Sequence, residues 1–215
     1  MRLHRLRALV RIGPHRLRAV PRTALALTGA AAIAPGVIAC GSGSAVRPAT
    51  GTGFAGAALP ASLPVHDFTL EDQAGHRVSL AGYRGQAVIL AFLSSTCGAT
   101  CTLIAQQIRG ALDELPRPVP VLFVSVDPRA DTGTEVRRFL ARVALTGRAS
   151  YLSGPPAALR PIWRAYGVVP VTSNRAAFER AASVLLLDRD GHRRVIFGVE
   201  QLTPEGVAHD VRKLS

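Results

Sequence analysis

The chain of 215 residues is poor in aromatic residues, which make up 5% of it, and it contains only three cysteines. Lysine is nearly absent as well, because Lys213 is the single lysine among 26 basic residues. With so few aromatic side chains, a buried core has to be built from leucine, valine, alanine and isoleucine. Hydrophobic residues reach 48% and charged residues 19%, which excludes a disordered chain and allows one folded domain.

The net charge of +12 is concentrated at the N-terminus. Residues 1–39 contain seven arginines and no acidic residue. The remainder carries an excess of only five positive charges, and it has no basic run of the kind that follows a phosphate backbone. We therefore expect no nucleic-acid binding.

The first forty residues have the order of an export signal. A basic stretch ends at Arg22, and seventeen uncharged, mostly apolar residues follow it. This run is too short and too rich in alanine and glycine for a stable membrane-spanning helix. Val37-Ile-Ala-Cys40 resembles the lipobox of bacterial lipoproteins, in which the cysteine becomes the lipid-modified first residue. We predict a lipoprotein-type signal peptide over residues 1–39 and a lipid anchor on Cys40, with a weak uncleaved anchor as the alternative.

Either anchor places the protein on the extracytoplasmic face of the bacterial plasma membrane. Residues 41–61 are rich in glycine, serine, alanine and proline and show no apolar period. Such a composition predicts a flexible tether. The folded domain is then expected over residues 62–215.

Within that domain, continuous apolar runs indicate strands that are covered on both faces. We predict these strands over residues 87–93, 119–126, 183–187 and 194–199. The last two are expected to form an antiparallel hairpin, because turn-forming residues separate them. A further hairpin is expected in front, on either side of Asp72-Gln-Ala-Gly75.

Apolar side chains at helical spacing predict helices over residues 100–115 and 134–145. Thr203 and Pro204 mark the start of a closing helix, and Trp163 and Tyr166 are expected in the core. This order of strands and helices predicts an α/β domain of thioredoxin-like fold. It has an extra N-terminal β-hairpin and a mixed sheet flanked by helices.

Cys97 and Cys101 come directly after the first buried strand, at the start of the first long helix. Folds of this kind build their sites at the carboxyl ends of parallel strands, and the exposed amides of a helix N-terminus favour a thiolate. The spacing of four brings both sulfurs to one side of the helix, close enough for a disulfide or a shared metal ion. A plain stabilising disulfide is the alternative, although so short a loop gains little from one.

From about residue 66 to residue 213 the sequence resembles the Sco/SenC family, copper-handling proteins of cytochrome c oxidase assembly. The motifs that carry the resemblance are Asp67-Phe-Thr-Leu-Glu-Asp-Gln-Ala-Gly, Gly82-Tyr-Arg-Gly-Gln, Ser125-Val-Asp-Pro-Arg-Ala-Asp-Thr132, Tyr166-Gly-Val168 and Ser183–Gly191. The resemblance implies copper as the cofactor and Cys97 and Cys101 as its ligands. It also implies an extracytoplasmic partner that presents a thiol pair or a copper site, such as a subunit of cytochrome c oxidase.

The sequence departs from the family in two places. Proline usually follows each cysteine of the family motif, whereas Gly98 and Thr102 stand there in this chain. The third copper ligand of the family is a histidine, and its position falls at Arg180. Arginine repels a copper ion and stabilises a thiolate, although two thiolates alone can hold Cu(I).

Three possibilities stay open on the sequence: a copper chaperone, a thiol–disulfide oxidoreductase, and a degenerate paralogue that does neither, such as a peroxide or redox sensor. In the oxidoreductase, Cys97 would attack and Cys101 would be the resolving thiol. His66 and His76 remain candidates for a third ligand. We expect His192 to lie at the far end of its strand from the cysteines, because five strand residues span about 17 Å.

Overall fold

The computed structural model of the protein describes residues 53–215. The predictions for the signal peptide, for Cys40 and for residues 41–52 of the tether lie outside the described residues. The chain divides into two units, Met1–Ala45 and Val46–Ser215, and the fold lies within the second.

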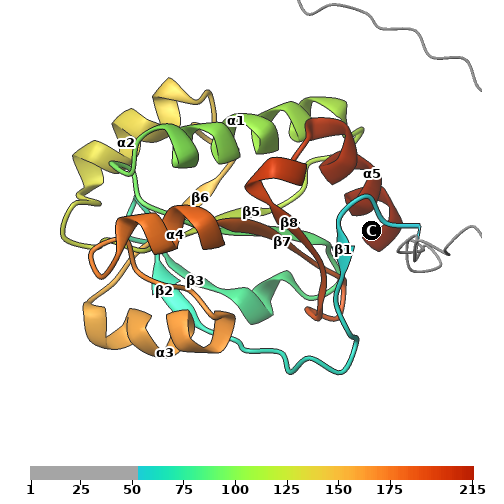
Figure 1. The fold of residues 1–215 in the computed structure, drawn as a ribbon, viewed down its shortest axis with the longest axis horizontal. Coiled ribbons are helices and arrows are strands. Elements are labelled where there is room, and N and C mark those ends of the chain that lie inside the picture. Colours follow the sequence, from blue (N-terminus) through green and yellow to red (C-terminus); the bar gives the residue numbers. More distant parts are fainter. Residues whose placement is uncertain (1–52) are drawn as a thin grey trace, which may run out of the picture. The chain divides into compact units, whose positions relative to one another are not determined.

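Six strands form a mixed sheet in the order β1-β8-β7-β4-β5-β6 (Figure 1). Their bounds are β1 Ala57–Ala58, β4 Val88–Leu93, β5 Val121–Ser125, β6 Ser150–Leu152, β7 Ser183–Leu187 and β8 Arg193–Gly198. β4, β5 and β6 run parallel, while β7 pairs antiparallel with β4 and with β8. The predicted front hairpin is also present, as β2 Thr69–Glu71 and β3 Arg77–Ser79. The α/β fold class with its mixed sheet is therefore confirmed.

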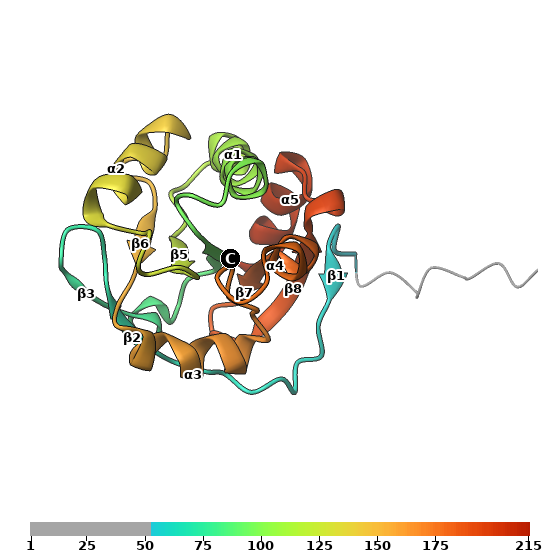
Figure 2. The same ribbon diagram turned by 60° about the vertical axis from the view of Figure 1, so that its left-hand side comes forward.

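The helices cover both faces of this sheet (Figures 1 and 2). Their bounds are η1 Leu80–Tyr83, α1 Ala99–Glu114, α2 Gly133–Arg142, α3 Pro156–Tyr166, α4 Arg175–Ala181, η2 Val199–Gln201 and α5 Pro204–Leu214. α1 and α5 lie side by side on one face, and α3 lies on the opposite face. Between residues 53 and 215, none of the helices has the length and apolar character needed to cross a membrane.

The core follows the predicted apolar runs. Every residue of β4 and of β5 is buried, as expected for strands with helices on both sides. In α1 the buried stripe includes Cys101, Ile104 and Ile108, which anchors the second cysteine in the core. Leu103 is apolar as well, but it is 39% exposed because the buried stripe is centred on Ile104 and Ile108.

β6 and α4 are among the short elements that were not predicted. β6 has only three residues, too few to show a period of two. α4 has seven residues and begins after Asn174, whose side chain accepts a hydrogen bond from the Ala177 N–H. The closing helix agrees with its predicted start, because the Thr203 hydroxyl accepts a hydrogen bond from the Gly206 N–H.

The predicted tether is wrong for residues 53–61. Ala57 and Ala58 pair with β8, and the buried carboxylate of Asp210 accepts hydrogen bonds from the N–H groups of Ala55 and Gly56, at 2.8 and 2.9 Å. Gly56 lies so close to the sheet that an added Cβ would be 2.6 Å from Val195. A small residue is therefore required there for close packing, whereas its composition alone resembles that of a linker.

We expect Gly56→Ala to lower the free energy of unfolding by about 1–3 kcal/mol, the usual cost of overpacking a filled site. Gly82→Ala is the matched control, because an added Cβ at Gly82 meets nothing within 4 Å. Urea unfolding of both variants measures the difference. Equal stability of the two variants would contradict the close packing of Gly56 against Val195.

Candidate functional site

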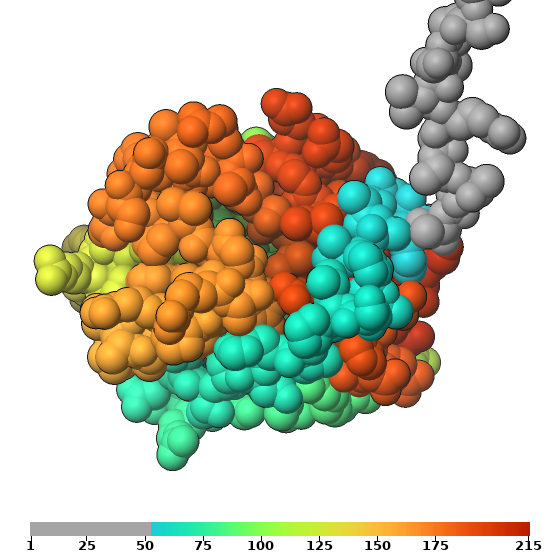
Figure 3. Space-filling model, turned by 60° about the horizontal axis from the view of Figure 1, so that its bottom comes forward, coloured from blue at the N-terminus to red at the C-terminus, as the bar shows by residue number. Residues whose placement is uncertain are grey.

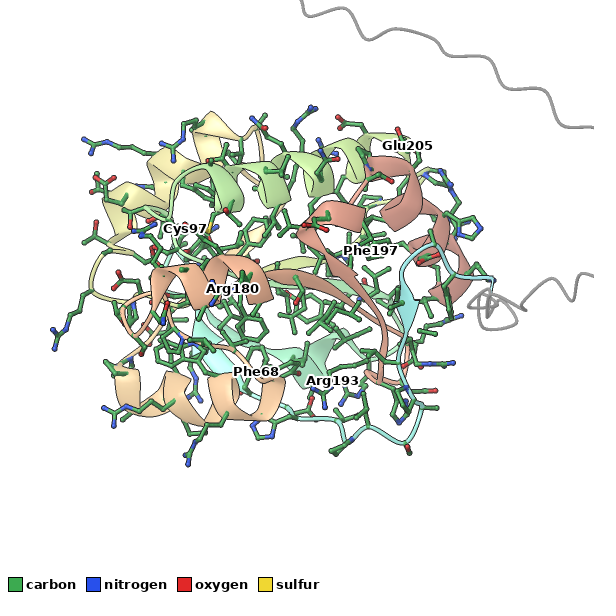
Figure 4. The ribbon with its side chains drawn as sticks, in the orientation of Figure 1. Phe68, Cys97, Arg180, Arg193, Phe197 and Glu205 are labelled. Atoms are coloured by element: carbon green, nitrogen blue, oxygen red, sulfur yellow. A yellow bond between two sulfur atoms is a disulfide. The ribbon has the colours of Figure 1, made fainter. Side chains whose placement is uncertain are left out.

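The structure joins Cys97 and Cys101 by a disulfide, with their Cα atoms 5.9 Å apart. Cys97 lies in the loop that follows β4, and Cys101 lies in the first turn of α1. The two positions predicted from the sequence are therefore brought together, and Figure 4 shows Cys97 beneath the start of α1. The Cα separation falls within the usual range for a disulfide.

Gly98 makes the turn between the two cysteines possible. Its φ of +86° belongs to the region that glycine enters at no steric cost. Proline, which the related motif carries at this place, is held near −65° and cannot adopt that φ. The Thr102 hydroxyl and N–H both donate to the Gly98 carbonyl, at 2.9 and 3.2 Å. Gly98 and Thr102 thus define the path of this chain into α1.

Both cysteines are buried: Cys97 is 2% exposed and Cys101 is fully covered. A thiol of another molecule can reach a sulfur only after the surrounding loop has moved. The nearby cavity of about 210 Å³, between α3, α4 and the segment after β1, is lined by apolar side chains such as Phe92 and Phe178 and not by either cysteine. Figure 3 shows the hollow on that face of the molecule.

An arginine lies against the cysteine loop, as expected, but it is Arg175. Its guanidinium donates to the Cys97 carbonyl at 3.0 Å. Arg180 stands five residues further along α4, a rise of about 7.5 Å. It borders a cavity together with Ala57 of β1, away from β4, and Figure 4 shows it on α4. Among the described residues, the Cys97 carbonyl therefore accepts a hydrogen bond from Arg175 and none from Arg180.

None of the described histidines approaches the cysteines to complete a metal site. Among residues 53–215, the single group of three or more His, Cys, Asp or Glu side chains close enough to share an ion is Asp188, Asp190 and His192. It lies in the turn after β7. Since Leu187 pairs with Val88 and Val184 with Ala91, this turn is at the end of the sheet opposite to Cys97, as predicted for His192.

His66 and His76, the remaining candidates, have other neighbours. His66 packs edge-on against the ring of Tyr166, with the ring centroids 6.2 Å apart. His76 lies 3.5 Å from the carboxylate of Asp72 in the exposed hairpin turn. Within the described chain, a metal ion at the reduced pair would find two thiolates and no third ligand of these types. Such a site suits Cu(I), which accepts linear coordination by soft sulfur ligands.

A buried carboxylate lies under the cysteine loop. Asp131 is 6% exposed, and it accepts hydrogen bonds from the hydroxyls of Ser94, Ser95 and Ser125 and from the Ser95 N–H. The Tyr151 hydroxyl also donates to it, at 2.8 Å. Burial, and then the charge of Asp131, raise the pKa of Tyr151 well above its ordinary value. This network was missed from the sequence, although Ser125 and Asp131 belong to one of the motifs that carried the resemblance.

A cysteine pair between a central strand and its crossover helix defines a thioredoxin-like thiol centre. The family model for SCO1/SenC matches residues 57–215. The chain therefore belongs to the SCO1/SenC family, and the resemblance predicted from its motifs is confirmed.

Solved structures agree with this assignment. Apo Sco1 of Thermus thermophilus is 25% identical, with a TM-score of 0.61, and the match covers 75% of this chain and 97% of that chain. ScoI of Bradyrhizobium japonicum with copper bound is also 25% identical, with a TM-score of 0.53 and coverage of 70% and 99%. The thioredoxin domain of a thiol-disulfide oxidoreductase from Bacteroides vulgatus has the same fold, at 15% identity, a TM-score of 0.54 and coverage of 71% and 97%. A comparison with curated protein sequences gives no match.

The contact of Arg175 with the Cys97 carbonyl generates a prediction for the reduced protein. We expect Arg175→Ala to slow alkylation by iodoacetamide at neutral pH about threefold, because an exposed charge contributes up to about 1 kcal/mol to a nearby thiolate. Arg180→Ala is the matched control and should leave the rate unchanged. The rate can be followed by mass spectrometry. A larger effect of Arg180→Ala would contradict the placement of the two arginines.

Proposed function

We propose that this chain is a membrane-tethered, extracytoplasmic copper chaperone that carries Cu(I) on Cys97 and Cys101. We further propose that it supports the assembly of a copper centre of cytochrome c oxidase. The main support for this proposal is a pair of cysteines whose Cα atoms lie 5.9 Å apart. They lie at the start of the first crossover helix of a SCO1/SenC domain. The copper bound in ScoI of Bradyrhizobium japonicum supports the choice of metal.

The disulfide has to be opened before copper can bind. A dithiol of a partner protein attacks it, and the two electrons and two protons of that dithiol pass to Cys97 and Cys101 while the partner's own cysteines form a disulfide. Cu(I) then replaces the two protons on the sulfurs, since the thiolate is the metal ligand. No change in the oxidation state of copper is needed for loading.

The ligand set favours Cu(I) over Cu(II). Two thiolates satisfy the soft cuprous ion, whereas the cupric ion prefers a tetragonal set that includes nitrogen or oxygen ligands. Among residues 53–215, no histidine or carboxylate shares an ion-sized site with the two cysteines. We infer that loading and delivery take place in the cuprous state and that Cu(II) binds weakly.

A thiol–disulfide oxidoreductase is the second candidate. The missing third ligand and the disulfide itself favour it. In this role Cys97 attacks a disulfide of the partner and Cys101 resolves the mixed disulfide, so that the pair ends oxidised and the partner ends reduced. Copper would then have no part in the activity.

For the anchor, we propose the lipid on Cys40. A SCO1/SenC family lipoprotein from Bacillus anthracis, 17% identical, has a related fold and supports this proposal. Expressed in a bacterium with lipoprotein processing, the protein should begin at Cys40 and carry the mass of a diacylglyceryl group, and Cys40→Ser should abolish both. Mass spectrometry of the mature N-terminus measures this. An unmodified Cys40 would contradict the lipoprotein prediction and favour the uncleaved anchor.

The copper proposal is tested by anaerobic competition of the reduced protein with a chromophoric Cu(I) chelator. We expect one Cu(I) per chain, and we expect the double variant Cys97→Ser, Cys101→Ser to bind it more than about 100-fold more weakly. Loss of a residue that only hydrogen-bonds to a metal ligand already lowers metal affinity by up to about 100-fold, so loss of both ligands should cost more. Equal affinities would end the chaperone proposal. If glutathione disulfide is still reduced by the wild type in that case, the second candidate takes its place.

A further inference from the structure

The Asp131 network links the cysteine loop to the rigid centre of the sheet. Ser94 and Ser95 begin the loop that leads from β4 to Cys97. The hydroxyls of Ser94 and Ser95 and the Ser95 N–H all donate to the same oxygen of Asp131, Oδ1, at 2.7 to 3.1 Å. The loop is thus tied from within by three hydrogen bonds.

The other carboxylate oxygen faces the sheet. The hydroxyls of Ser125, at the end of β5, and of Tyr151, in β6, donate to Oδ2 at 2.5 and 2.8 Å. Tyr151 also lies 3.0 Å from the Leu93 carbonyl, at the end of β4. One carboxylate therefore joins β5 and β6 to the cysteine loop that follows β4.

The connection continues to Cys97 through a tight turn. The Cys97 N–H donates to the Ser94 carbonyl at 3.2 Å, and the Thr96 N–H donates to the Ser94 hydroxyl at 3.3 Å. The position of Ser94 therefore fixes the backbone of Cys97. On the outer side, by contrast, the loop is held by side chains at the surface: Arg175 on the Cys97 carbonyl and Arg142 on the Ser95 carbonyl, the latter at 3.5 Å.

We propose that Asp131 is a positioning residue of the thiol centre. It holds Cys97 at disulfide distance from Cys101 when the pair is reduced, and so it sets how stable the disulfide is relative to the dithiol. This inference rests on the thiol chemistry of the proposed function and does not depend on copper. Its physical basis is effective concentration, since a thiol held near its partner forms the disulfide more readily than one on a relaxed loop.

An amide in place of the carboxylate breaks the network. In Asp131→Asn one side of the group becomes an NH₂, which cannot accept the hydrogen bonds that now reach that oxygen. Either the loop side or the sheet side then has buried donors without an acceptor, and the loop relaxes. The reduced state gains more freedom than the disulfide state, in which a covalent bond still holds the loop.

We expect Asp131→Asn to lower the equilibrium constant for disulfide formation in a glutathione buffer at least tenfold, a rise in reduction potential of about 30 mV. Asp210→Asn is the matched control. Asp210 is also buried and accepts backbone hydrogen bonds, but it holds the residues before β1 rather than the cysteine loop. It should lower the free energy of unfolding and leave the potential unchanged. If Asp131 merely stabilised the fold, Asp131→Asn would likewise lower the free energy of unfolding and leave the reduction potential unchanged.

A milder pair of variants covers the case in which Asp131→Asn fails to fold. Ser95→Ala removes one hydroxyl on the loop side of the carboxylate, and Ser125→Ala removes one on the sheet side. The proposal requires a larger shift in potential for Ser95→Ala than for Ser125→Ala. Equal shifts, or an unchanged potential in Asp131→Asn, would overturn it. The reduction potential is measured without copper. If Cu(I) fails to bind in the titration but Asp131→Asn still shifts the potential, only the chaperone role is rejected.

Discussion

The parallel pairing of β4 with β5 determines where the chemistry of this protein lies. Leu93 pairs with Ser125, and the Val126 N–H donates to the Leu93 carbonyl, so both strands end at the same edge of the sheet. The chain leaves β4 into the cysteine loop and leaves β5 into the loop that contains Asp131. Two segments far apart in sequence therefore meet at the carboxyl ends of the central strands, where folds of this kind place their sites.

Two buried aspartates perform the same physical task at different ends of the domain. Each is removed from water and surrounded by hydrogen-bond donors of another segment, an arrangement that is costly to break because a buried charge is left unpaired. Asp131 joins the cysteine loop to β5 and β6, and Asp210 of α5 holds the residues before β1. Burial of a charged group thus gives the domain both its N-terminal boundary and the inner support of its thiol pair.

The chain belongs to the SCO1/SenC family, and two features of its own lie directly beside the cysteines. A glycine with positive φ follows Cys97, and an arginine donates to the Cys97 carbonyl. The arginine favours thiol chemistry, since a positive charge near a reduced cysteine stabilises its thiolate. The described residues also add no third metal ligand. Cuprous ion is the form of copper that such a site can accept without further protein ligands.

Local sequence determined the fold class because the signals were long. Long apolar signals mark the central strands β4, β5 and β7, and a periodic apolar stripe marks α1. Each signal can be read as one kind of element only, because its period or its length is clear. The position of the cysteine pair followed from the same signals, since it needed only the end of one strand and the start of one helix. The family followed from motifs that can be read without a structure.

The tertiary structure decided what depends on contacts between distant segments. The segment around Gly56 has the composition of a linker. Only the close approach of Gly56 to Val195 shows that this segment packs against the sheet. The sequence pointed to Arg180, at the position of the family's histidine, whereas the placement of α4 gives Arg175 the hydrogen bond to the Cys97 carbonyl. The partners of Asp131 lie between 6 and 37 residues away along the chain, on both sides of it, and no local pattern encodes such pairs. The sequence by itself therefore determined the elements and the thiol pair, whereas the packing of the chain determined which side chains support that pair.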